Sequence, residues 1–189
     1  TPTIYTVSGS NTVPCVSSQT VLVDVFIQTV TITGNTVICN GKNTNLTGNG
    51  ADNYTWNGAN FSNGNSATYS PTTTTTYTLS TSTFTNGITC SYTKTFQIVV
   101  NPKPNITAAL TRTTFCKGET NTLTANGAQT YTWNNGGGNA ATVVINGSFV
   151  TVFNYSVSGT DANGCVNSAT ILVTIIACTG IENLEKESQ

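Results

Sequence analysis

The sequence contains no histidine, and only 7% of its residues are charged, against about 25% in ordinary soluble domains. Histidine is the commonest general base and metal ligand in proteins, so a His-based catalytic or metal site is excluded. The acidic residues before the C-terminal tail are Asp24, Asp52, Glu119 and Asp161. They are scattered along the chain, and no two of them form a catalytic pair. We therefore predict that the protein is not an enzyme, with no catalytic residue, no metal and no cofactor.

Net charge and long apolar runs are also missing. A formal charge of −1 provides no electrostatic footprint for nucleic acid or for an anionic membrane. The sequence has no run of 18 apolar residues, the length that a membrane span requires. Its first four residues lack the basic start and apolar run of a signal peptide. We predict no nucleic-acid partner and no membrane span. The abundant Thr, Asn, Ser and Gly suit a secreted polymer-forming or adhesive protein, or reflect a compositional bias without functional meaning.

What the sequence does contain is a repeat. The segment from Cys39 to Trp56 returns from Cys116 to Trp133 without a gap. A second similarity, at an offset of 150 residues, joins the two ends of the chain: Tyr5-Thr-Val-Ser-Gly9, Cys15 and Thr20-Val-Leu-Val23 match Tyr155-Ser-Val-Ser-Gly159, Cys165 and Thr170-Ile-Leu-Val173. We predict the last strands of a truncated module at residues 1–28, whole modules at 29–102 and 103–178, and a linker or tail at 179–189.

The apolar residues alternate with a period of two, which is typical of β-strands. This alternation predicts a strand over residues 21–28, with counterparts at 95–100 and 170–176. Asn-Gly pairs separate the expected strands, and they are the strongest short turn signal because both residues tolerate positive φ. No window before the charged tail has the pattern of a capped amphipathic helix. We predict an all-β fold made of tandem immunoglobulin-like β-sandwich repeats in a rod.

The order of motifs within a repeat agrees with this fold. Leu-Thr, Tyr-x-Trp, Tyr-x-Val or Tyr-x-Leu, and a Val-rich strand match strands B, C, F and G of an immunoglobulin-like sandwich. Trp56 and Trp133 would then be the strand C tryptophans of the two cores. The alternative for these rings is stacking on carbohydrate. The segment Asn101-Pro-Lys-Pro104 predicts a stiff, extended junction between modules.

Six cysteines indicate disulfide bonds, because modules of about 75 residues bury too little surface to be stable without further support. Disulfides imply an oxidising compartment, so we expect a secreted, extracellular or cell-surface protein. Free buried thiols in a cytosolic protein are the alternative.

Two pairing schemes are open. Pairing within repeats joins Cys39 to Cys90 and Cys116 to Cys165. Immunoglobulin topology disfavours it, because the first cysteine of each pair would start strand B and the second would follow the F–G turn at the opposite end of the module. Strands of this kind span about 20 Å, whereas the Cα atoms of a disulfide lie within about 7 Å.

A staggered scheme fits the topology better. It joins Cys39 to Cys165 and Cys116 to Cys178, which also explains a cysteine just past the last strand. Cys15 and Cys90 would then reach cysteines of modules that this sequence does not contain in full.

Several motifs resemble those of a known repeat family. They are Cys-x-Gly-x-x-x-x-Leu-Thr-x-x-Gly, Tyr-x-Trp, Pro71-Thr-Thr-Thr-Thr-Thr-Tyr77-Thr-Leu and Gly-Thr-Asp161-Ala-Asn-Gly-Cys165. The chain resembles the Ig-like/PKD-like repeats of secreted Bacteroidota cell-surface proteins. Ala177-Cys-Thr-Gly-Ile181 resembles the linker before a type IX secretion sorting domain. The Pro-Thr run is lost in the second module, at residues 148–154. In that family such repeats form stalks and surface fibres of adhesins, gliding proteins and hydrolases.

The predicted function is therefore structural or adhesive, as a disulfide-linked stalk or a component of an extracellular filament. The expected partners are other Ig-like modules of the same or neighbouring chains, with surface polysaccharide as a further candidate. A carbohydrate-binding module, or the accessory stalk of a secreted hydrolase, is the alternative. If the chain starts at residue 1, another subunit must complete the truncated module, which would give a head-to-tail filament by strand complementation. A fragment of a longer chain is the other interpretation.

Overall fold

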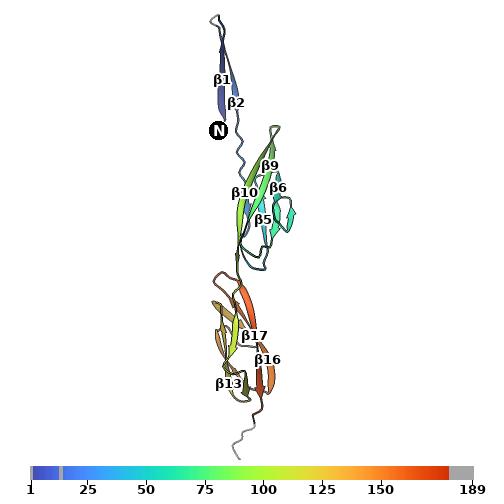
Figure 1. Ribbon diagram of the computed structural model, residues 1–189, viewed down its shortest axis with the longest axis vertical. Coiled ribbons are helices and arrows are strands. Elements are labelled where there is room, and N and C mark those ends of the chain that lie inside the picture. The colour runs from blue at the N-terminus through green and yellow to red at the C-terminus, as the bar shows by residue number, and fades with distance from the viewer. Residues whose placement is uncertain (1, 13–14, 179–189) are drawn as a thin grey trace, which may run out of the picture. The chain divides into compact units, whose positions relative to one another are not determined.

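The computed structural model describes residues 2–12 and 15–178. The described residues form strands, turns and irregular connections and contain no helix (Figure 1). The all-β prediction is therefore confirmed. The linker or tail expected at residues 179–189 lies outside the described residues.

The chain divides into two compact units. The first unit consists of residues 1–35, 44–69 and 76–96, and the second unit consists of residues 36–43, 70–75 and all residues from 97 onward.

The first unit begins with a hairpin of β1 (Thr3–Ser10) and β2 (Val16–Val23), which forms a sheet of its own (Figure 1). All residues of both strands are exposed. The strand expected over residues 21–28 ends at Val23, so that prediction is wrong in its extent. Val23 lies opposite Thr3, the first residue of β1. Beyond that pair the hairpin offers no backbone partner, and a strand ends where its ladder of hydrogen bonds ends.

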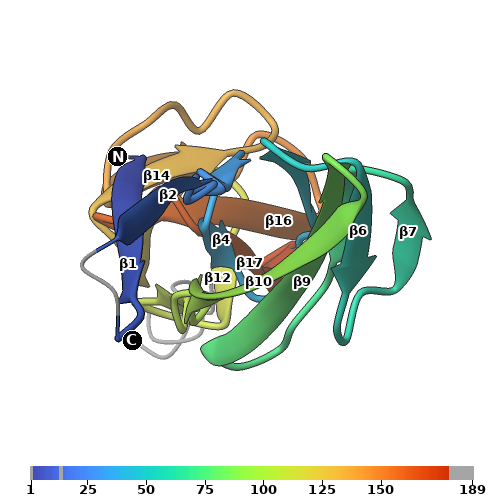
Figure 2. The same cartoon turned by 90° about the horizontal axis from the view of Figure 1, so that it is seen from above.

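Residues 31–101 form two four-stranded sheets. One sheet has the order β3 (Thr31–Thr33), β5 (Thr44–Asn49), β8 (Ser66–Tyr69) and β7 (Phe61–Asn63); the other has the order β4 (Val37–Cys39), β10 (Ile88–Asn101), β9 (Thr75–Thr85) and β6 (Asn53–Trp56). In the order given, the first sheet corresponds to strands A, B, E and D of an immunoglobulin sandwich, and β6, β9 and β10 correspond to C, F and G. Figure 2 shows β7 as the edge strand of its sheet.

The core of the first unit is aromatic. The rings of Trp56, Tyr69, Tyr77 and Phe96 form one cluster in which each ring contacts at least two others, with centroids 4.4 Å apart for Tyr69 and Tyr77 and 5.9 Å apart for Trp56 and Phe96. Along β5, inward and outward residues alternate, and Leu46 is fully buried. Burial raises the pKa of the Tyr69 phenol to about 12, and the neighbouring Tyr77 phenol adds to this rise.

The second sandwich lies entirely in the second unit. One sheet has the order β11 (Thr107–Leu110), β13 (Thr120–Asn126) and β15 (Thr142–Asn146); the other has the order β12 (Thr114–Cys116), β17 (Val166–Ile176), β16 (Thr151–Thr160) and β14 (Thr130–Trp133). This arrangement repeats that of residues 31–101 without the edge strand β7. Its core contains Phe115, Leu123, Trp133, Val157 and Val173. The two sheet pairs confirm tandem immunoglobulin-like sandwiches.

Candidate functional site

Two disulfide bonds are the most distinctive feature of the second unit. The first joins Cys39, the last residue of β4, to Cys165 in the turn between β16 and β17, with a Cα–Cα distance of 5.5 Å. This distance lies within the range that an unstrained disulfide requires. Cys165 is fully buried. The bond connects residues that belong to successive repeats of the sequence.

Local hydrogen bonds shape the turn that presents Cys165. One carboxylate oxygen of Asp161, Oδ1, accepts hydrogen bonds from the backbone N–H groups of Asn163, at 2.9 Å, and of Cys165, at 2.8 Å. Gly164 has a φ of 77°, a region that favours glycine. The Asp-Ala-Asn-Gly-Cys motif therefore acts as a turn, with the carboxylate satisfying backbone donors.

The second disulfide joins Cys116 to Cys178, with a Cα–Cα distance of 5.4 Å. Strand β12 pairs in parallel with the end of β17, so that Cys116 lies opposite Ile176. That register places Cys116 beside the last residues of the strand, two positions before Cys178. The Glu119 carboxylate accepts a hydrogen bond from the Cys116 backbone N–H at 3.1 Å and pairs with Arg112 at 3.1 Å.

The structure thus contains the staggered pairs Cys39–Cys165 and Cys116–Cys178, and neither Cys39–Cys90 nor Cys116–Cys165. The expected positions of Cys39 and Cys116 within their strands were wrong. Cys39 and Cys116 end the short strands β4 and β12, whereas the sequence predicted that they begin the strands that follow. Gly41 and Gly118 have φ values of 82° and 90°, and each helps to turn the chain between the two strands. This turn explains the glycine two positions after each cysteine.

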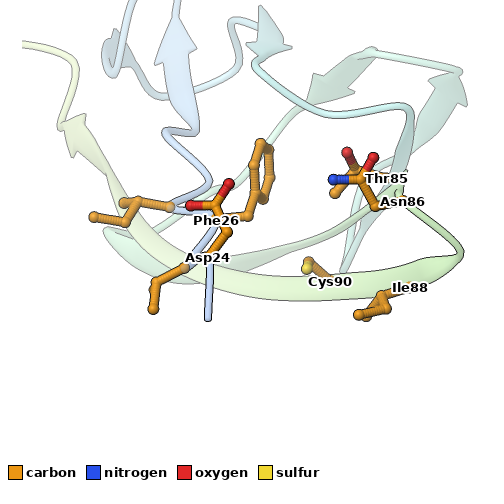
Figure 3. A pocket seen from close by; sticks show the side chains of 8 residues that line it. Asp24, Phe26, Thr85, Asn86, Ile88 and Cys90 are labelled. Carbon is orange, nitrogen blue, oxygen red and sulfur yellow. The ribbon is translucent and has the colours of Figure 1, made fainter. Parts of the chain in front are cut away.

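The remaining cysteines are free thiols. Cys15 is exposed and Cys90 is partly exposed. Cys90 lies on β10 and lines a cavity of about 250 Å³, together with residues 24–27 and residues of the β9–β10 turn. Figure 3 shows the side chains of Phe26 and Cys90 facing this same cavity. Sequence reasoning did not identify the cavity, because residues 24–27 were expected to continue a strand.

The two tryptophans are buried in the cores of their sandwiches. Trp56 is 7% exposed and Trp133 is 4% exposed. Trp133 Nε1 donates a hydrogen bond to the Ala140 carbonyl at 3.0 Å, whereas the buried Trp56 Nε1 has no partner. Buried rings offer no face for stacking on carbohydrate. The exposed aromatic side chains are instead Tyr5, Phe26, Phe61, Phe84, Tyr92, Phe149 and Phe153.

Three of the four acidic residues before the tail accept hydrogen bonds from backbone N–H groups. Besides Asp161 and Glu119, Asp52 accepts a hydrogen bond from the Phe84 backbone N–H at 2.9 Å. Asp24 lines the Cys90 cavity. Among residues 2–12 and 15–178, no three His, Cys, Asp or Glu side chains gather closely enough to hold a metal ion. The same part of the chain has no helix that could cross a membrane.

The fold and the cysteines together define a tandem immunoglobulin-like β-sandwich protein with two disulfide bonds, and such bonds point to an extracellular or secreted protein. No family model matches the sequence, and no curated protein matches it.

Solved structures with some similarity include the N-terminal eight Ig domains of Down Syndrome Cell Adhesion Molecule, with a TM-score of 0.41 and 14% identity over 92% of this chain and 28% of that one. The insect immune protein hemolin has a TM-score of 0.37 and 14% identity over 93% of this chain and 56% of hemolin. The fibronectin(III)-like modules of Clostridium thermocellum CbhA have a TM-score of 0.37 and 11% identity over 78% of this chain and 95% of that one. The chain therefore spans less than two thirds of the first of these proteins.

Proposed function

We propose that the chain is a structural or adhesive part of an extracellular protein, with Ig-like modules at residues 29–102 and 103–178 in a stalk or filament. The observation that carries this proposal is the Cys39–Cys165 bond, which links successive sequence repeats covalently. Such a covalent link between repeats suits a stalk, because it raises resistance to unfolding. The low charge of the chain also suits close packing of copies without repulsion.

Labelling of intact cells of the source organism tests this proposal. An antibody against the second unit should stain the surface of unpermeabilised cells or a filament that they release. Signal that appears only after permeabilisation would overturn the extracellular assignment. Staining of unpermeabilised cells would support it.

A finer proposal concerns the export route. The motifs at Cys39 to Trp56 and around Cys165 resemble repeats of Bacteroidota proteins that use type IX secretion. We propose this route for the present protein. Deletion of the secretion machinery in the source organism should then retain the protein inside the cell envelope. Unchanged export in the deletion strain would contradict the route while leaving the structural function intact.

Binding to surface polysaccharide is the second candidate, and the exposure of several aromatic rings favours it. Phe61, Phe84 and Phe149 are each about two thirds exposed or more, and solvent-facing rings are available for stacking. A glycan array and pull-down on insoluble polymers with the oxidised full chain test this candidate. Binding that a Phe84→Ala or Phe149→Ala variant abolishes would establish it. The absence of binding to any glycan on the array would favour the structural function.

A further inference from the structure

The β1–β2 hairpin has the same register as β16–β17, 150 residues later. Tyr5 lies opposite Val21 in the first hairpin, and Tyr155 lies opposite Ile171 in the second. Every paired position of β1–β2 has its counterpart at this offset in β16–β17. The two hairpins are thus the same structural element, the last two strands of a sandwich.

Their burial differs completely. Val157 and Val173 are fully buried in the core of the second unit, where they belong to the same cluster as Leu123 and Trp133. Their counterparts Val7 and Val23 are 73% and 42% exposed. Exposed apolar side chains on a strand pair whose twin is buried indicate a surface that another element covers. The second unit shows which element that is, namely the strands β11 to β15.

Cys90 provides an independent observation. It aligns with Cys165, because Thr95 and Thr170 begin equivalent stretches of β10 and β17 in the two repeats. Cys165 is bonded to Cys39, which lies opposite Asn101 in the parallel pairing of β4 with β10. The corresponding thiol of Cys90 is free. By this equivalence, Cys90 occupies a position that can form a disulfide bond with a cysteine at the end of a short strand such as β4.

The expected position of that partner follows from the register. Cys39 and Cys116 lie opposite Asn101 and Ile176, and the position equivalent to Ile176 at the offset of 150 is Phe26. A strand that paired with residues 24–26 as β12 pairs with Thr174–Ile176 of β17 would thus place its cysteine beside Phe26. Phe26 and Cys90 line the same cavity of about 250 Å³ (Figure 3). The exposed hairpin and the free thiol therefore indicate the same occupant.

We propose that the β1–β2 hairpin and Cys90 form a docking site for the first strands of another Ig-like repeat, whose cysteine bonds to Cys90. The occupant is a segment with the sequence pattern of residues 103–146, supplied by polypeptide outside the printed sequence. A second copy of this chain does not supply it, because its Cys39 and Cys116 are already engaged. This inference deepens the proposed function and rests on it, since the bond requires an oxidising compartment.

Bond formation needs an oxidant, and a small-molecule disulfide meets that requirement. The partner thiolate attacks the oxidant disulfide and forms a mixed disulfide, which releases one thiol. The Cys90 thiolate then attacks the partner sulfur and releases the second thiol. In the balance, the thiols of Cys90 and its partner are oxidised to one disulfide, and one disulfide oxidant is reduced to two thiols.

The first test is disulfide mapping of the native protein. Free thiols are alkylated on intact material, which is then digested without reduction and analysed by mass spectrometry. The expected result is Cys90 bonded to a peptide that is absent from the printed sequence and carries Cys-x-Gly. Recovery of Cys90 as an alkylated thiol, or bonded to Cys15, would overturn the proposal. Either result leaves the cell-surface labelling unaffected, so the failure of this inference is distinguishable from the failure of the proposed function.

The second test uses the oxidised full chain and a peptide of residues 103–148, in which Cys116 is the sole cysteine. All chains carry Cys15→Ser, which removes the other free thiol, and in a glutathione redox buffer we expect a covalent one-to-one adduct at Cys90. A Val7→Asp, Val23→Asp double variant should reduce its yield at least tenfold, because both changes lie on the docking face and neither side chain is in a core. The matched control is Val144→Asp, at a valine that is 63% exposed elsewhere. Equal yields from all three chains, or from Cys90→Ser, would overturn the proposal.

Discussion

The two sandwiches, at residues 31–101 and 107–176, share a strand order, but the two compact units differ in their stabilising features. The first unit packs four aromatic rings, those of Trp56, Tyr69, Tyr77 and Phe96, and its two cysteines are free. The second unit surrounds one tryptophan largely with aliphatic side chains and has both disulfide bonds. The topology is therefore a property of strand order and turn positions. The choice between ring packing and covalent links is free to vary from one repeat to the next.

Removal of the Cys116–Cys178 bond should have the largest effect and should be confined to the second unit. The bond spans 62 residues, so the loop-entropy model assigns it about 4 kcal/mol of the free energy of unfolding. We expect a Cys116→Ser, Cys178→Ser variant to lose about 2 to 5 kcal/mol. Guanidinium denaturation followed by Trp133 fluorescence in a Trp56→Phe background measures the loss.

The control for this variant is the first unit. The same two serines in a Trp133→Phe background should leave the transition reported by Trp56 unchanged. A loss of equal size in both reporters would show that the two units unfold as one, and the contrast between them would then not extend to their stability.

Alkaline pH should weaken the first unit selectively. The pKa of Tyr69 is about 12 in the folded chain, above the ordinary tyrosine value of 10.0, so the folded state holds the phenolic proton more tightly than the unfolded state does. The stabilisation is fully present below pH 10 and is lost as the pH rises through about 12, with a total of about 2 to 3 kcal/mol. Denaturation midpoints between pH 8 and pH 12, read from Trp56 after alkylation of the free thiols, measure it.

Tyr69→Phe is the matched variant for this prediction. It keeps the ring and removes the ionisable hydroxyl, which donates a hydrogen bond to the Asn57 carbonyl at 3.1 Å. Its stability should fall less between pH 10 and pH 12 than that of the unsubstituted chain. Parallel pH profiles for the two chains would assign the loss to other groups.

The two tryptophans should respond differently to the same substitution. Trp133→Phe removes a hydrogen bond to the Ala140 carbonyl, whereas Trp56→Phe removes a buried N–H that has no partner. The ring volume lost is the same in both cases. We expect Trp133→Phe to cost about 1 to 2 kcal/mol more than Trp56→Phe. Differential scanning calorimetry of the two variants, which resolves the two units if they melt separately, makes the comparison. Equal costs would mean that the hydrogen bond to Ala140 contributes nothing net.

Much of the fold was predictable because most strand and turn motifs occur in both repeats, and each occurrence predicts the same element. Alternation along segments such as Thr44–Asn49 predicts strands, and Asn-Gly pairs predict the turns between them. At Asn86-Gly87, both residues have positive φ, 50° and 79°, as the β9–β10 turn requires. The staggered cysteine pairing was also within reach, since it depends on which end of a sandwich each cysteine occupies.

What could not be predicted depends on partners that are distant in sequence. The three-residue strands β4 and β12 exist because the last strands β10 and β17 pair with them in parallel. No local sequence pattern predicts such a long-range pairing. The same dependence explains the early end of β2 at Val23. It also explains why the β1–β2 hairpin is exposed although its sequence alternates as that of β16–β17 does, because alternation encodes a buried face but not the presence of what buries it.

The positions of the two disulfides also decide how the chain would respond to a pull on its ends. Tension that reaches Cys39 passes through the sulfur bridge directly to Cys165, which is 126 residues further along the chain. At about 3.4 Å for each extended residue, roughly 430 Å of polypeptide is withheld from the load. This segment, which includes most strands of both sandwiches, can extend only after the disulfide bond is reduced. Between Cys39 and Cys165 a mechanical load would therefore pass through the covalent bridge and bypass the strands in between, whereas the hairpin β1–β2 and strands β3 and β17 lie outside the bridged segment and would bear the load through their sheet hydrogen bonds.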